Sequence, residues 1–120
     1  MSREAIRWRL LVSAAEDFEP LFHALWEFGV PADPQPGAPS ADEIKAVLWE
    51  LIDEGLIELY QGQTPDGEFV PVGADRRPTV FQSPDSWRVY EHPANDVRYS
   101  TTAAGDEAVR RPPQGADEPT

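Results

Sequence analysis

The chain contains no cysteine, a single lysine and only two histidines among its 120 residues. Without cysteine it can form no disulfide, no thiolate metal site and no cysteine nucleophile. His23 and His92 lack the paired spacing of a metal-binding motif, so we predict neither a metal nor any other cofactor. No glycine-rich phosphate loop follows a predicted strand, and no serine lies in a nucleophile elbow. Catalysis is left without candidate residues, and we predict a protein that is not an enzyme.

Long apolar runs are also missing from the sequence. Arg3, Arg7 and Arg9 interrupt the hydrophobic segment near the N-terminus, which is therefore typical neither of a membrane span nor of a signal sequence. We expect a cytoplasmic protein that does not enter a membrane. The length fits one domain, and an apolar fraction of 40% is enough for a packed core.

Negative charge is abundant, and most of it lies in the middle of the chain. The formal net charge is -12. Residues 41–70 contain eight carboxylates against a single base, Lys45. Such a segment attracts positively charged partners and repels nucleic acid.

The strongest local signal spans residues 40–61. Ser40 is a good helix N-cap, and Glu43 completes a capping box. Gly55 can adopt the left-handed conformation that ends a helix, and residues 56–60 then read as a short strand. The apolar side chains at helical spacing form one stripe, made of Ile44, Val47, Leu48, Leu51 and Ile52.

Periodicity and turn residues predict the remaining elements in chain order. The first part of the chain is predicted to contain a helix over 3–18, a helix from Pro20 to Phe28 with an apolar face that includes Trp26, and a proline-rich connector over 30–39. After the central helix and strand we expect an excursion over 61–97, with a turn at 65–67. A strand over 96–102, a helix over 103–110 and a disordered tail over 111–120 complete the chain. We expect residues 97–101 to pair antiparallel with residues 56–60 and to close the excursion at its base.

Two motifs, LWELIDEGLIELY at 48–60 and VRYSTTAAGDEAV at 97–109, carry a resemblance. The chain resembles the winged helix-turn-helix domains of MarR-type and PadR-type regulators, whose third helix closes in a similar Glu-Gly-Leu-Ile pattern. Their last wing strand runs into Tyr-x-Leu-Thr-x-x-Gly, and here Thr101 stands where those families have leucine. The chain is also similar to uncharacterised actinobacterial proteins, a resemblance that implies no mechanism.

The resemblance implies an α+β winged helix-turn-helix fold over residues 1–110. Three N-terminal helices would be followed by a β-hairpin and a short C-terminal helix. The wing, at about 61–97, would be much longer than is usual in these families.

A winged helix that binds DNA places its third helix in the major groove and needs positive charge there. The solvent side of the predicted helix instead presents Trp49 and carboxylates. We predict that it binds a protein with a basic surface, with Trp49 at the centre and Glu50, Asp53 and Asp42 as an anionic rim. Trp49 either packs under the proline-rich connector or is exposed. The chain would then act as an adaptor, a regulator of another protein, or an antitoxin-like or immunity-like inhibitor.

Two further hypotheses follow from the sequence. The alternative function is a DNA-binding transcriptional regulator, whose phosphate contacts would come from Arg76, Arg77, Arg88 and Arg98. The apolar arc of the first helix is wide, which indicates either a helix buried in the core or a homodimer contact. The residues of that possible contact are Trp8, Val12 and Ala15.

Overall fold

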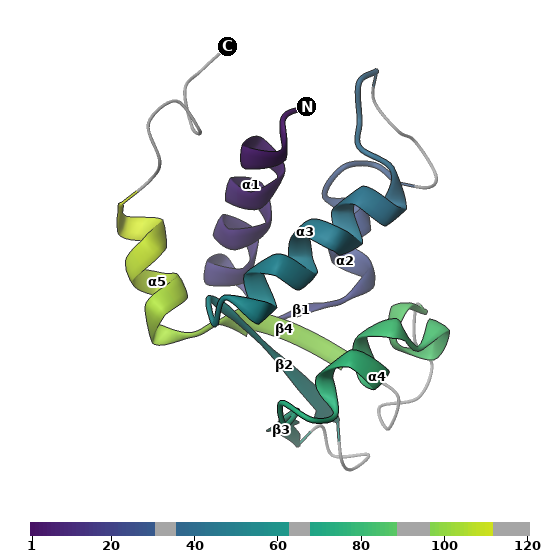
Figure 1. The fold of residues 1–120 in the computed structure, drawn as a ribbon, viewed down its shortest axis with the longest axis vertical. Helices are drawn as coiled ribbons and strands as arrows, with labels where there is room; N and C mark the ends of the chain where they lie inside the picture. Colours follow the sequence, from purple (N-terminus) through teal and green to yellow (C-terminus); the bar gives the residue numbers. More distant parts are fainter. Residues whose placement is uncertain (31–35, 63–67, 89–96, 112–120) are drawn as a thin grey trace.

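The helices α1 (Arg3–Glu16) and α3 (Ala41–Asp53) pack against each other on one side of a four-stranded antiparallel sheet (Figure 1). The computed structural model describes residues 1–30, 36–62, 68–88 and 97–111. The remaining helices are α2 (Phe22–Trp26), α4 (Arg77–Gln82), the 3₁₀ helix η1 (Pro84–Trp87) and α5 (Ala103–Arg110). The strands are β1 (Glu19–Pro20), β2 (Ile57–Gly62), β3 (Phe69–Pro71) and β4 (Val97–Thr101), in the sheet order β1-β4-β2-β3. The chain is therefore a small α+β domain.

The predicted pairing of the two strands that close the excursion is confirmed. β2 and β4 are antiparallel, with Ile57 opposite Thr101 and Leu59 opposite Tyr99. Alternate residues of both strands face the helices and are buried, as the two-residue period of a strand requires. On its other edge β4 pairs with β1, which the sequence did not predict.

The central helix begins and ends where the sequence predicts. The hydroxyl oxygen of Ser40 accepts a hydrogen bond of 3.1 Å from the Glu43 amide, and Gly55 has a φ of 79° just beyond the helix. All five members of the predicted apolar stripe are at most 1% exposed. With residues of α1, α2, β2 and β4 they make a single core.

The region of the second helix differs from the prediction. Residues 19–20 form β1, and α2 covers only Phe22–Trp26. Leu21, Ala24 and Phe28 face the core, whereas the side chain of Trp26 is 51% exposed. A helix this short turns only some of its side chains inward, so Trp26, which the sequence places on the apolar face, lies largely at the surface.

The long excursion contains more structure than the sequence indicated. β2 and β3 pair antiparallel across residues 63–67, and the predicted turn at 65–67 lies outside the described residues. After β3 come α4 and η1, which are too short to produce a clear helical period. The predicted disordered tail lies outside the described residues from position 112 onward.

The two motifs behind the family resemblance contact each other directly. The Thr102 hydroxyl donates a 2.6 Å hydrogen bond to the Gly55 carbonyl, and the Thr102 amide donates to the Leu56 carbonyl at 3.1 Å. The same hydroxyl caps α5 by accepting from the Gly105 amide at 3.1 Å. Threonine and glycine at this spacing therefore join the start of α5 to the turn between α3 and β2.

Tyr99, in the central strand, carries the largest fully buried side chain in the core. Its hydroxyl has no hydrogen-bond partner among the described residues. Burial raises the pKa of Tyr99 far above its ordinary value, and the nearby Ser13 side chain offsets only part of this effect. Burying a hydroxyl without a well-formed hydrogen bond costs free energy, so we expect the phenol oxygen to add little to the stability of the fold.

Replacing Tyr99 with phenylalanine should leave the free energy of unfolding unchanged at neutral pH or increase it by about 1 kcal/mol. Above pH 10 the unfolded wild type ionises at Tyr99 while the folded form does not, so its stability should fall by about 1.4 kcal/mol per pH unit relative to the variant. Urea unfolding at neutral and alkaline pH measures both effects. Burial and the nearby Glu58 also raise the pKa of Tyr60. Because Tyr60 is present in both proteins, its ionisation changes the stability of both equally and does not affect the difference between them. A variant that loses more than about 1 kcal/mol at neutral pH would show that the hydroxyl is well satisfied.

Candidate interaction surface

A groove of about 410 Å³ lies between α3, α4 and η1. One wall is a face of α3 with the helical spacing i, i+3, i+4, i+7, and the opposite wall comes from the excursion. The lining residues are Asp42, Lys45, Ala46, Trp49, Phe81, Gln82 and Trp87. Two residues of the predicted interaction site, Trp49 and Asp42, are therefore brought together here.

Three aromatic rings shape this groove. The ring centroids of Trp49 and Phe81 are 5.1 Å apart, and those of Phe81 and Trp87 are 5.2 Å apart in an edge-to-face arrangement. The indole nitrogen of Trp87 donates a 2.7 Å hydrogen bond to the Phe81 carbonyl, which fixes the orientation of its ring. Trp49 is half-buried, and the aromatic ring that packs against it is that of Phe81 from α4. Residues 31–35 of the proline-rich connector lie outside the described residues.

The charges around the groove are only partly compensated. The Lys45 ammonium lies 4.7 Å from the centroid of the Trp87 ring. Asp42 and Asp53 are exposed, and within the described part of the chain neither takes part in an ion pair. Asp42 lines the groove and Asp53 does not.

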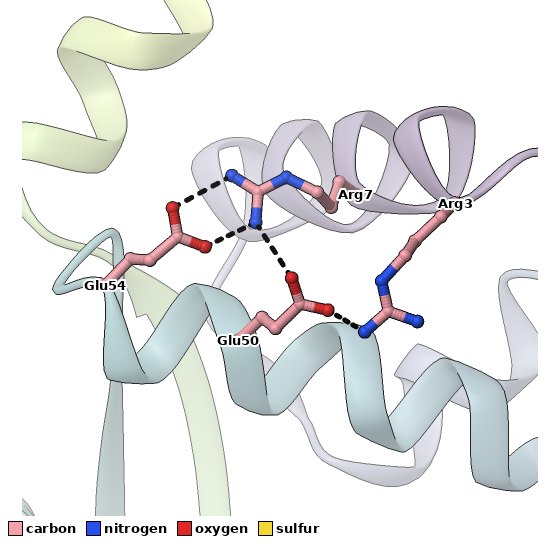
Figure 2. A network of polar contacts seen from close by, with 4 residues as sticks. All are labelled: Arg3, Arg7, Glu50 and Glu54. Carbon is pink, nitrogen blue, oxygen red and sulfur yellow. Dashed lines mark hydrogen bonds and ion pairs between the residues drawn. The ribbon is translucent and has the colours of Figure 1, made fainter.

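Glu50, the other carboxylate of the predicted rim, contacts α1 and does not line the groove. Figure 2 shows Glu50 and Glu54 directed toward Arg3 and Arg7. Arg7 holds Glu54 with two hydrogen bonds, one of them 3.2 Å long, and its guanidinium nitrogen is 3.8 Å from a Glu50 oxygen. Arg3 pairs with the other Glu50 oxygen. These four side chains tie α1 to α3.

A double-mutant cycle on Arg7 and Glu54 should give a coupling free energy of about 1 kcal/mol, near the top of the range for exposed pairs because the contact is bidentate. The Arg3 and Glu50 pair is more exposed on its basic side, so its coupling should be smaller. Urea unfolding of the single and double alanine variants gives both values. Raising the salt concentration to about 1 M should reduce both coupling free energies. A coupling free energy that does not change with salt would rule out an ion-pair origin.

The arginines of the DNA-binding hypothesis are engaged with other parts of the chain. Arg76 donates to Gln61 at 3.0 Å, and Arg77 donates to the Val72 carbonyl at 3.2 Å. Arg88 pairs with Asp85 at 3.2 Å. Arg98 donates to the Phe18 carbonyl at 3.1 Å, and its guanidinium lies over the rings of Phe18 and Phe69. These contacts give each arginine a partner within the chain.

The residues of the possible dimer contact lie along α1. Trp8 and Val12 are half-buried and Ala15 is exposed. Trp8 lines a hollow of about 240 Å³ together with Leu51 of α3, Leu56 of the turn after α3 and Ala108 of α5. Helix α5 therefore covers part of the wide apolar arc, and the homodimer stays a prediction.

Sequence reasoning missed Lys45, Phe81 and Trp87 as groove residues. A signal for Lys45 was present, since it lies three residues after Asp42 and four before Trp49 on one helix face. For Phe81 the signal was weaker. Pro78 in the first turn of α4 is typical of a helix start, and Val80 and Phe81 follow it.

Among the described residues, no three His, Asp or Glu side chains are grouped so that they could hold a metal ion. Within the same ranges, no helix is long and apolar enough to cross a bilayer. His23 pairs with Glu19, and His92 lies outside the described residues. The chain matches no protein-family model, no curated protein and no solved structure.

Proposed function

We propose that the chain is a non-catalytic winged-helix protein that acts by binding another protein through the groove between α3 and α4–η1. The winged-helix assignment is supported by the order of the helices and by β1 pairing with β4 beside β2. One feature departs from a DNA-binding helix-turn-helix. Residues 27–40 separate α2 from α3, whereas that motif joins its helices by a turn of about three or four residues.

The observation that carries this proposal is that α4 and η1 pack on the outward face of α3. Trp49 contacts Phe81, and Lys45 lies over Trp87. A helix that reads the major groove must present that face to base edges. In this chain the same face is one wall of an aromatic groove, which is a shape suited to side chains of a protein.

The composition of the groove indicates the kind of partner. Buried aromatic anchors surrounded by polar residues are typical of the centres of protein interfaces. The net charge of -12 steers a basic surface toward the chain and repels an acidic one. An adaptor, a regulator of another protein, or an antitoxin-like or immunity-like inhibitor would all use such a surface.

The alternative, a transcriptional regulator, receives less support. Its four arginines have intramolecular partners, and several must be released before they can neutralise phosphates. The carboxylates Asp42 and Asp53 on α3 would add repulsion near the duplex.

A photo-crosslinking residue in place of Gln82, which is exposed and lines the groove, tests the proposal. The same residue in place of Ala104, which is exposed on α5, is the matched control. We expect a basic protein to crosslink from position 82 and not from 104, and the purified partner to bind the wild type in solution. Random duplex DNA should not bind at about 50 mM salt, where non-specific electrostatic binding is strong. Crosslinking from both positions, or salt-sensitive duplex binding, would contradict the proposal.

A further inference from the structure

The ammonium group of Lys45 already occupies part of the aromatic groove. It lies 4.7 Å from the centroid of the Trp87 ring, within the range of a cation–π interaction. Lys45 is the only lysine of the chain, and its side chain is half-buried. The structure therefore shows that the face of Trp87 accepts a cation.

The rings around this position are held in place before any ligand arrives. The hydrogen bond from the Trp87 indole to the Phe81 carbonyl satisfies the polar edge of the indole, while Lys45 lies over its face. Trp49 packs against Phe81 from the α3 side. Rings that are already oriented lose little conformational freedom on binding, which favours affinity.

A carboxylate completes the arrangement. Asp42 lies one helical turn before Lys45 and lines the same groove. Aromatic faces next to a carboxylate are the combination that recognises organic cations, because the rings attract the charge and the carboxylate pairs with it.

From this geometry we propose that the groove recognises an arginine side chain in an extended basic segment of the partner, which takes the place of the Lys45 ammonium over Trp87. The inference rests on the proposed function and names the feature of the partner that the groove selects. A guanidinium is planar, more weakly hydrated than an ammonium and suited to both stacking and pairing with a carboxylate, so it displaces the lysine favourably.

Lys45 is then an internal competitor for the site. It occupies the Trp87 face in the free protein, and its charge repels an incoming cation. Removing its charge should therefore strengthen binding, which is the opposite of the usual effect of truncating an interface residue.

The test is a titration with a short peptide that is acetylated and amidated at its ends and carries one arginine between glycines and serines. A second peptide carries citrulline, the neutral isostere, at the same position. Indole N–H signals in NMR spectra report binding at the groove. We expect the citrulline peptide to bind about tenfold more weakly than the arginine peptide, as expected for the loss of a desolvated cation–π contact and an ion pair.

Three variants separate recognition in the groove from general attraction by charge. Lys45→Met keeps much of the aliphatic packing and should bind the arginine peptide about fivefold more tightly, with Lys45→Ala as a second version. Arg110→Ala is the matched control, because it makes the same change in net charge on the exposed end of α5, which contributes no residue to the groove and lies on the opposite side of the domain from α4 (Figure 1). It should change the affinity by less than about twofold. Asp42→Asn should weaken binding, and circular dichroism checks that each variant is folded.

Several results would overturn the inference. Equal affinity for the two peptides would show that the groove does not select a cation. If Arg110→Ala increases the affinity for the arginine peptide as much as Lys45→Met does, the increase is due to net charge and not to the groove. If neither peptide binds but a protein crosslinks specifically from position 82, recognition of arginine is refuted while the proposed function stands. If nothing binds or crosslinks at the groove, both are refuted.

Discussion

Replacing Gly105 with alanine should destabilise the domain by about 3 kcal/mol or more. A methyl group at this position would overlap the Leu56 carbonyl oxygen and lie 3.0 Å from the Thr101 side chain. That carbonyl belongs to the junction that joins α5 to the turn after α3, where it already accepts from Thr102. Alanine gains about 1 kcal/mol over glycine in helix propensity, which is too little to offset a clash with the backbone.

Urea unfolding of Gly105→Ala measures this effect. The control is Ala104→Gly, an exposed position on the same turn, which should cost about 1 kcal/mol or less through helix propensity alone. If the two substitutions have equal effects, the close approach of α5 to Leu56 does not limit the choice of residue at 105.

Replacing Trp49 with alanine should weaken binding of the protein partner by about 2 kcal/mol, or roughly thirtyfold. The same substitution should lower the free energy of unfolding by about 2 kcal/mol, because Trp49 packs against Phe81 and the edge of the core. Affinity is therefore measured by calorimetry at a temperature where circular dichroism shows the variant to be folded.

Trp26→Ala is the matched control for this prediction. It removes an indole that is 51% exposed on α2 and does not line the groove. We expect it to leave the partner affinity unchanged. If Trp26→Ala loses as much affinity for the partner as Trp49→Ala does, the interface includes α2 and is not centred on the groove.

The elements with strong local signals could be predicted from the sequence. Helix α3 has a capping serine at its start, an apolar stripe along one face and a left-handed glycine just after its end. β2 and β4 flank one excursion and alternate in burial, so their antiparallel pairing follows from the same pattern. Both cases depend on residues that are near neighbours in the sequence or belong to regular elements.

The candidate groove could be predicted only in part, because half of it depends on contacts between distant residues. Trp49 and Asp42 were found from the face of one helix. Phe81 and Trp87 lie more than 30 residues later, on elements of six and four residues that show no reliable period. The contact of Glu50 with α1 was not predicted for the same reason, since its partner Arg3 is 47 residues away.

The most direct measurement of the central claim is an NMR map of the surface that a protein partner and a DNA duplex each perturb. Backbone and indole signals of the isotopically labelled chain are followed during titration with the crosslinked partner and, separately, with random duplex DNA at low salt. The account predicts that the partner shifts signals of the groove residues, Trp49 and Phe81 above all, and that the duplex shifts none of them. Duplex-induced shifts on α3 and around Arg76 and Arg98, with the groove unaffected by the protein, would contradict it.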